Sequence, residues 1–175
     1  MIHAITTRKA VRRLTASITL AALAAGPAAW AAEKHKVSGT ATFVSMAART
    51  SGFSTDKPKR EMAQWTAVWS FASSASDFDG MIETAPTQSI DGPGIGRHQG
   101  FFTFRHRNGD ESHGYFHGTH EVVSKPDGSW DMNIDGVKVI TGGTGRFANA
   151  KGTLRYSARN TPYGAQFGYS GDIEY

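Results

Sequence analysis

The sequence predicts an all-β protein, an eight-stranded antiparallel β-barrel that follows a short N-terminal leader. Two observations lead to this fold class. After residue 31, no window of eleven or more residues places apolar side chains at helical spacing. Instead, eight segments alternate apolar and polar residues between turn signals, a pattern typical of sandwiches and barrels. Eight strands are about the number at which a closed barrel can just hold one small ligand.

The expected strands, in order, span residues 35–46, 62–73, 78–84, 100–107, 112–124, 129–140, 152–159 and the segment after a turn at 162–164. Asn108-Gly109-Asp110 and Pro126-Asp127-Gly128 are hairpin signals. Residues 85–96, with two prolines and three glycines, are expected to form the least structured connection. Within 129–140 the apolar alternation changes phase at Asp135–Gly136, which predicts a bulge that turns Val137 and Val139 inward.

Aromatic residues gather on one face of several expected strands. Trp65 and Trp69 share a face with Ala67 and Phe71, and Phe102, Phe104 and His106 share another. A packed core would explain these aromatics. A lumen whose walls stack on a planar ligand would explain them too. On the second interpretation the ligand-binding residues are Trp65, Trp69, Phe102, Phe104, Tyr156, Phe167 and Tyr169.

A glycine-rich stretch, Gly142 to Gly152, satisfies the loose dinucleotide fingerprint as Gly143-x-Gly145-x-x-Ala148. That fingerprint needs a following helix and an acidic residue about 20 positions on. Here strand-like alternation follows, and no Asp or Glu occurs between Asp135 and Asp172. We therefore interpret the stretch as a structural corner between two strands, built by Gly142, Gly143, Gly145, Phe147 and Gly152.

The same corner carries a family resemblance. A Gly-Gly-Thr-Gly-Arg-Phe stretch before the last two strands resembles the allene oxide cyclase-like and dirigent-like barrels, specifically over residues 139–156 and more loosely over 98–175. The resemblance implies a calycin-like eight-stranded barrel with a lumen for a small, mostly apolar ligand, and a homo-oligomer, often a trimer. These families include cyclases, stereochemical guides and proteins without known activity, so the resemblance leaves the chemistry open.

Residues 1–31 have the composition of a signal peptide. Four basic residues precede an uncharged, alanine-rich run from Leu14 to Trp30, and Ala29-Trp30-Ala31 places small residues where a signal peptidase reads them. Cleavage is expected between Ala31 and Ala32, which leaves one domain, residues 32–175, in the periplasm or outside the cell. A run of seventeen residues is short for a permanent membrane span. Arg12-Arg13 hints at twin-arginine export, but Thr15 favours the general route.

Charge and cysteine content exclude several kinds of function. Four of the 19 Lys and Arg residues and none of the 15 Asp and Glu residues lie in 1–31, so residues 32–175 are formally neutral. A nucleic-acid-binding domain would carry a basic surplus, so we expect no nucleic-acid partner. The absence of cysteine excludes thiol catalysis and cysteine-bound metals.

Five of the seven histidines fall between His98 and His120. On one strand His113 and His117 would be about 13 Å apart, too far to share a metal ion. A site formed by two histidines with Glu121 or Asp110 matches no established zinc spacing. We therefore expect no metal and no cofactor.

Acid–base catalysis needs a titratable group held in an apolar pocket. His106, His117 and Glu121 lie within otherwise apolar or aromatic strands and are the candidates if the protein is an enzyme. The first expectation is an exported barrel that binds a small hydrophobic or aromatic ligand without turnover. The alternative is a cofactor-free cyclase or isomerase of the allene oxide cyclase-like type.

Overall fold

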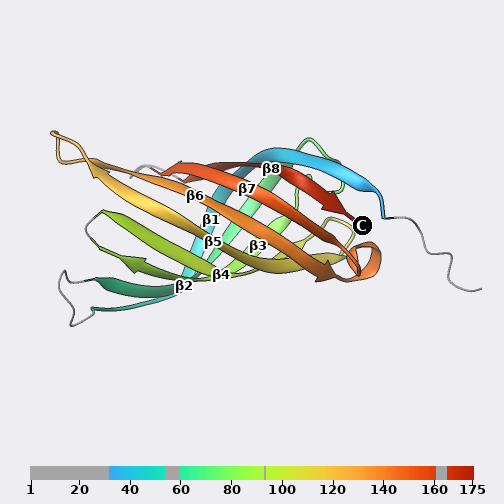
Figure 1. Cartoon of the computed structure of the whole chain (residues 1–175), viewed down its shortest axis with the longest axis horizontal. Coiled ribbons are helices and arrows are strands. Elements are labelled where there is room, and N and C mark those ends of the chain that lie inside the picture. The colour runs from blue at the N-terminus through green and yellow to red at the C-terminus, as the bar shows by residue number, and fades with distance from the viewer. Residues whose placement is uncertain (1–31, 54–59, 93, 161–164) are drawn as a thin grey trace, which may run out of the picture. The chain divides into compact units, whose positions relative to one another are not determined.

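The computed structural model describes residues 32–53, 60–92, 94–160 and 165–175, and the leader assigned to 1–31 lies outside these residues. Eight antiparallel strands pair in sequence order, and β1 also pairs with β8, which closes the barrel (Figure 1). The strands are β1 Lys34–Phe53, β2 Glu61–Ser73, β3 Ile82–Asp91, β4 Ile95–Arg105, β5 Glu111–Ser124, β6 Trp130–Gly143, β7 Lys151–Asn160 and β8 Gln166–Glu174. The predicted fold class is confirmed. None of the described residues form a helix long and apolar enough to cross a membrane.

The third strand was predicted in the wrong place. Most of the expected connection 85–96 belongs to β3 and to the beginning of β4, whereas Phe78 lies in the turn segment before β3. The reason is that β3 inverts the usual pattern. It buries Glu83 and Ser89 and exposes Ile82 and Ile90. Sequence patterns identify a strand by apolar residues on its inner face, and β3 has polar residues there.

The predicted bulge at Asp135–Gly136 is also wrong. β6 pairs with β7 in unbroken register from Met132 to Ile140, and its only shift against β5 lies between His113 and Gly114 of that strand. Because side chains of a strand alternate between its faces, an unbroken register keeps even-numbered residues of β6 inside. Lys138, not Val137 or Val139, therefore continues the inner face, where it is 4 % exposed.

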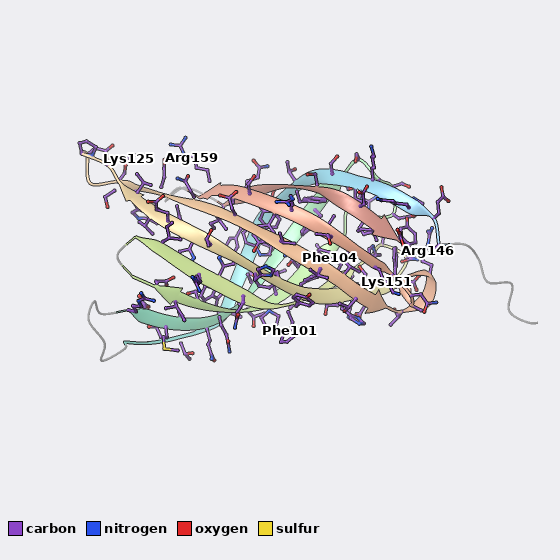
Figure 2. All side chains as sticks on the ribbon, in the orientation of Figure 1. Phe101, Phe104, Lys125, Arg146, Lys151 and Arg159 are labelled. Atoms are coloured by element: carbon purple, nitrogen blue, oxygen red, sulfur yellow. The ribbon has the colours of Figure 1, made fainter. Side chains whose placement is uncertain are left out.

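The alternation predicted for β4 is confirmed. Phe102 and Phe104 are buried inside the barrel, and Phe101 is 72 % exposed on its outer surface (Figure 2). β2 likewise buries Phe71 and turns Trp65 and Trp69 inward. Side chains on these inner faces form a packed core at the end of the barrel that holds the β2–β3 and β6–β7 connections.

This packed end is closed by two connections. Phe78, between β2 and β3, and Phe147, in the short 3-10 turn η1 Gly145–Phe147, are both buried and lie 5.6 Å apart between ring centroids. They cover a cluster of buried side chains that includes Val37, Met81, Phe102, Phe104, Ile140, Leu154 and Ile173. The glycine corner is thus part of the wall that seals one end of the barrel, and no helix follows it.

Candidate functional site

The other half of the barrel is hollow. A cavity of about 610 Å³, here called the chamber, receives side chains from all eight strands. Its apolar lining is formed by Phe43, Met46, Trp65, Ala67, Trp69, Ala85, Phe116, Val122, Trp130, Met132, Ile134, Ala158, Ala165 and Phe167. Its polar lining is formed by Glu61, Glu83, Thr87, Asp91, His98, His120, Lys138 and Tyr156. Such a cavity, apolar with a few polar groups, is typical of a small-molecule site.

Aromatic rings form one wall of the chamber. Trp69 of β2 makes edge contacts with Phe43 of β1 at 5.3 Å and with Phe167 of β8 at 4.7 Å between ring centroids. Next to Trp69, the inner positions of β2 and β3 are small, since Ala67 and Ala85 are directly paired across the two strands. The small residues leave the volume that larger side chains would have filled.

The floor of the chamber is a buried ion pair. Lys138 Nζ of β6 donates to Glu83 Oε1 of β3, and Glu83 is fully buried. The ammonium group lies 4.8 to 5.9 Å from the centroids of five rings, which belong to Phe102, Phe104, Phe116, Tyr156 and Phe167. Ring faces attract a cation, so this cage offsets part of the cost of desolvating the lysine.

The second carboxyl oxygen, Glu83 Oε2, has no hydrogen-bond partner among the described residues. Burial raises the pKa of Glu83 and outweighs the opposing effect of Lys138. Desolvation penalises the charged form of a carboxyl, and a raised pKa lets the group hold a proton closer to neutral pH. The floor therefore offers a carboxyl group that can take up or release a proton beside a fixed cation.

A line of four hydrogen-bonded side chains runs along the chamber wall from Asp91 at the end of β3, and we call it the relay. Asp91 Oδ1 accepts from His120 Nε2 at 2.5 Å, His120 Nδ1 lies 3.4 Å from His98 Nδ1, and His98 Nε2 lies 2.6 Å from the Tyr156 hydroxyl. Burial first, and then the neighbouring His120, lower the pKa of His98 to about 4. Burial raises the pKa of Tyr156, so its hydroxyl keeps its proton.

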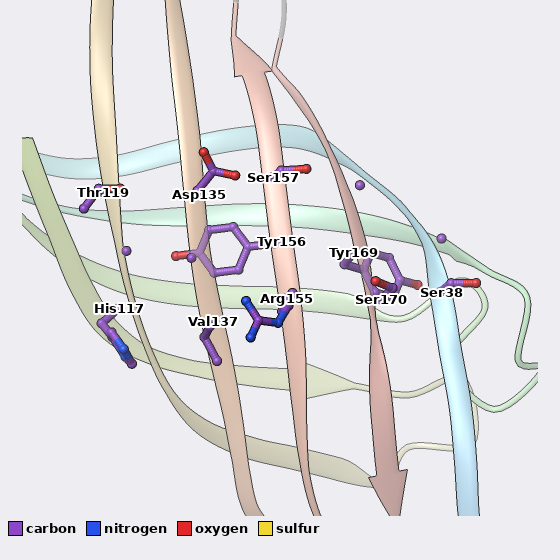
Figure 3. Close-up of a pocket in the computed structure, with 14 residues that line it drawn as sticks. Ser38, His117, Thr119, Asp135, Val137, Arg155, Tyr156, Ser157, Tyr169 and Ser170 are labelled. Carbon is purple, nitrogen blue, oxygen red and sulfur yellow. The ribbon is translucent and has the colours of Figure 1, made fainter. Parts of the chain in front are cut away.

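Inward-facing glycines make room for the relay. His98 is paired across the strands with Gly118, and Tyr156 with Gly136. A Cβ atom at Gly118 would overlap the His98 ring, and one at Gly136 would overlap the Tyr156 ring. Each ring can therefore lie flat over its partner strand, as Tyr156 does across β6 (Figure 3). The glycines leave room for both rings, so that His98 Nε2 and the Tyr156 hydroxyl can meet at the chamber wall.

Four of the seven residues predicted to bind a ligand line the chamber: Trp65, Trp69, Tyr156 and Phe167. The other three do not. Phe102 and Phe104 are packed in the core below the floor, where their rings approach Lys138 from the closed side. Tyr169 packs against Phe71 at 4.9 Å, and its hydroxyl donates to the backbone oxygen of Ala72.

The structure does not bring together the three catalytic candidates. His106 is buried in the closed end, where Nδ1 donates to Asp77 O at 2.9 Å and the ring stacks on Phe147 at 3.9 Å. Burial lowers the pKa of His106. His117 and Glu121 are exposed on the outer face of β5, where His117 borders a separate pocket with Asp135 and Arg155 (Figure 3). None of the three lines the chamber.

The sequence analysis did not identify five polar residues of the chamber as functional: Glu83, Asp91, His98, His120 and Lys138. One signal could have revealed the two histidines. Inner positions alternate between glycine and a ring along both strands, as Gly96, His98, Gly100 and Phe102 on β4 and Gly114, Phe116, Gly118 and His120 on β5. In antiparallel register each ring faces a glycine.

Within the described ranges, no group of three or more His, Asp or Glu side chains is arranged to hold a metal ion.

Comparison with known proteins adds no further evidence, because no family model, curated protein or solved structure matches this chain. The class that the structure itself defines is a closed eight-stranded barrel with one packed end and one hollow, aromatic end.

Proposed function

We propose that the protein is an exported barrel that binds a small hydrophobic or aromatic ligand in the chamber without converting it. The observation that carries this proposal is the chamber itself: about 610 Å³ walled by rings, above a floor with one buried ion pair. A filled barrel would be the more stable solution, since cavities in a core cost free energy. Replacing a buried ion pair by apolar residues is often neutral or stabilising, so the floor also favours a role in recognition.

A ligand-binding test can use intrinsic fluorescence. All three tryptophans of residues 32–175, Trp65, Trp69 and Trp130, line the chamber. We expect N-phenyl-1-naphthylamine, a neutral apolar dye, to bind saturably and to quench tryptophan emission by energy transfer.

A matched pair of variants tests the location. Ala85→Leu places a larger side chain in the chamber and should weaken dye binding by about tenfold. This is the binding free energy of roughly two buried methylene groups, which the dye would lose. Thr84→Leu adds a similar side chain at the neighbouring outer position and should leave binding unchanged. Dye binding that is insensitive to Ala85→Leu, or no saturable binding at all, would contradict the proposal.

A cofactor-free isomerase or cyclase is the second candidate, and Glu83 is the observation that favours it. A buried carboxyl with a raised pKa beside Lys138 could exchange a proton with a bound substrate while the cation stabilises the developing negative charge. If this is correct, ligand recovered from the Glu83→Gln protein should be converted by the wild-type protein to an isomer of the same mass. Recovery of one unchanged compound from both proteins would favour binding alone.

The homo-oligomer implied by the family resemblance also remains a proposal. Phe101 and Tyr115 are paired across β4 and β5 and are exposed by 72 % and 44 % on the outer face. Exposed aromatic pairs of this kind are enriched at protein interfaces. Native mass spectrometry of the exported protein would report the number of subunits and any retained ligand together.

A further inference from the structure

The relay of four side chains ends at the hydroxyl of Tyr156, a residue that lines the chamber. Its inner end is Tyr156, whose ring centroid lies 5.3 Å from Lys138 Nζ, and its outer end is the half-buried Asp91. Each histidine between them uses both ring nitrogens in the line. Because a neutral imidazole has one donor and one acceptor nitrogen, the direction of one hydrogen bond determines the direction of the next.

Without an added proton the directions follow from Asp91. A carboxylate only accepts, so His120 Nε2 carries the hydrogen and His120 Nδ1 is an acceptor. His98 Nδ1 must then donate to His120, which leaves His98 Nε2 as an acceptor for the Tyr156 hydroxyl. In this state Tyr156 turns the lone pairs of its oxygen toward a ligand.

One proton on His120 reverses the inner two bonds. His120 Nδ1 then donates to His98 Nδ1, so the hydrogen of neutral His98 moves to Nε2 and is donated to the Tyr156 oxygen. The hydroxyl hydrogen of Tyr156 becomes free to point into the chamber. His98 changes tautomer but not charge, consistent with its lowered pKa of about 4.

We propose that Tyr156 is the polarity-determining contact of the chamber, and that the protonation of His120 switches it from a hydrogen-bond acceptor to a donor through His98. This inference rests on the proposed binding function and adds a specificity to it. The protein should prefer ligands with a hydroxyl or amide donor when His120 is neutral, and ligands with a carbonyl or ether acceptor when His120 is charged.

Charged and titratable groups from five other strands line the chamber together with His120. They are Glu61 from β2, Glu83 and Asp91 from β3, His98 from β4, Lys138 from β6 and Tyr156 from β7, and His117 lies on the same strand as His120. When His120 takes up a proton, His98 changes tautomer and keeps its charge.

Nitrogen-15 magnetic resonance of the ligand-free protein tests the switch directly, because two-bond couplings show which ring nitrogen of a histidine carries hydrogen. Above the titration of His120 we expect His98 to be protonated at Nδ1, and below it at Nε2, with His98 neutral throughout. His106 is an internal control, since the carbonyl of Asp77 holds its hydrogen on Nδ1. A His98 that keeps one tautomer while His120 titrates, or that becomes charged first, would overturn the proposal.

A matched pair of probes tests the consequence for binding. 2-Acetylnaphthalene carries an acceptor and 2-isopropylnaphthalene has the same shape without one, and both can be measured by displacement of N-phenyl-1-naphthylamine. Lowering the pH through the titration of His120 should strengthen acetylnaphthalene binding relative to isopropylnaphthalene by about fivefold, the worth of one hydrogen bond.

Tyr156→Phe should abolish this pH dependence while the barrel still folds. Tyr169→Phe, which removes a hydroxyl bonded to Ala72 instead, should keep it. A pH dependence that survives in Tyr156→Phe would show that Tyr156 is not the switching contact. If neither probe binds, the proposed function fails, whereas the magnetic resonance result decides the switch independently.

Discussion

At the scale of single residues, Lys138 shows how a polar side chain can define a site from inside a core. It lies between Ile134 and Ile140 on the inner face of β6, and it is stabilised by Glu83 and by five surrounding rings. Burying both charges costs free energy that their attraction offsets only when the geometry is good. Removing one partner should therefore be much worse than removing both.

We predict that Lys138→Met lowers the free energy of unfolding by about 3–5 kcal/mol, because it leaves Glu83 buried without its cation. The loss should grow as the pH rises from 5 to 8. Without Lys138 the native state must keep a proton on Glu83 that the unfolded chain releases, so stability falls with rising pH. Urea denaturation at several pH values measures both effects.

The double variant Lys138→Met/Glu83→Leu is the control for this prediction. It replaces the pair by apolar side chains of similar volume and should return the stability to near that of the wild type. A double variant as unstable as Lys138→Met would mean that the ion pair itself holds the barrel together.

At the scale of elements, the corner between β6 and β7 shows why a glycine pattern needs its structural context. Gly145 has φ +53°, a left-handed conformation that β-branched residues rarely adopt, and a Cβ atom there would overlap the carboxylate of Asp110. That carboxylate accepts hydrogen bonds from the Arg146 backbone and the Asn108 side chain. These bonds therefore tie the β4–β5 turn to the connection between β6 and β7.

We predict that Gly145→Val destabilises the protein by about 1–3 kcal/mol through backbone strain, with further loss from displacement of Asp110. Thermal unfolding measures the effect. Gly168→Val is the matched control, because a Cβ atom at Gly168 in β8 meets nothing within 4 Å. If Gly145→Val kept its stability but lost binding of a phosphate-containing ligand, the dinucleotide interpretation of the corner would be favoured instead.

At the scale of the whole molecule, the packed core and the chamber lie at opposite ends of the barrel. The end sealed by Phe78 and Phe147 supplies the packed core, and the other end supplies the chamber. Closure of the sheet satisfies the backbone of every strand without exposed edges, so the hollow end does not depend on a core of its own. A domain without cysteine can therefore hold a cavity.

Export itself is a prediction from the first 31 residues. The protein recovered from the periplasm or the medium should begin at Ala32, and N-terminal sequencing or intact mass measurement checks this. Cleavage at this position would also change the formal charge of the protein, since it would remove four basic residues and no acidic ones. An exported protein that still begins at Met1 would contradict the assignment of the leader.

The sequence by itself determined the fold class, the inward face of β4 and the role of the corner as a connection, because alternation and turn residues are local signals. Trp65, Trp69, Tyr156 and Phe167, which the sequence analysis selected as ligand-binding residues, line the chamber, and ligand binding by them stays a prediction. The sequence analysis misplaced the third strand, because polar side chains of β3 face inward, and it wrongly predicted a bulge in β6 at Asp135–Gly136.

Only the tertiary structure decided which residues meet. Glu83 and Lys138 are 55 positions apart, and His98 and Tyr156 are 58 apart. Closure of eight strands brings each pair together. Burial, not residue type, then shifts the pKa values of the Glu83 carboxyl and the His98 imidazole, because a group loses its solvent only once the barrel has closed around it.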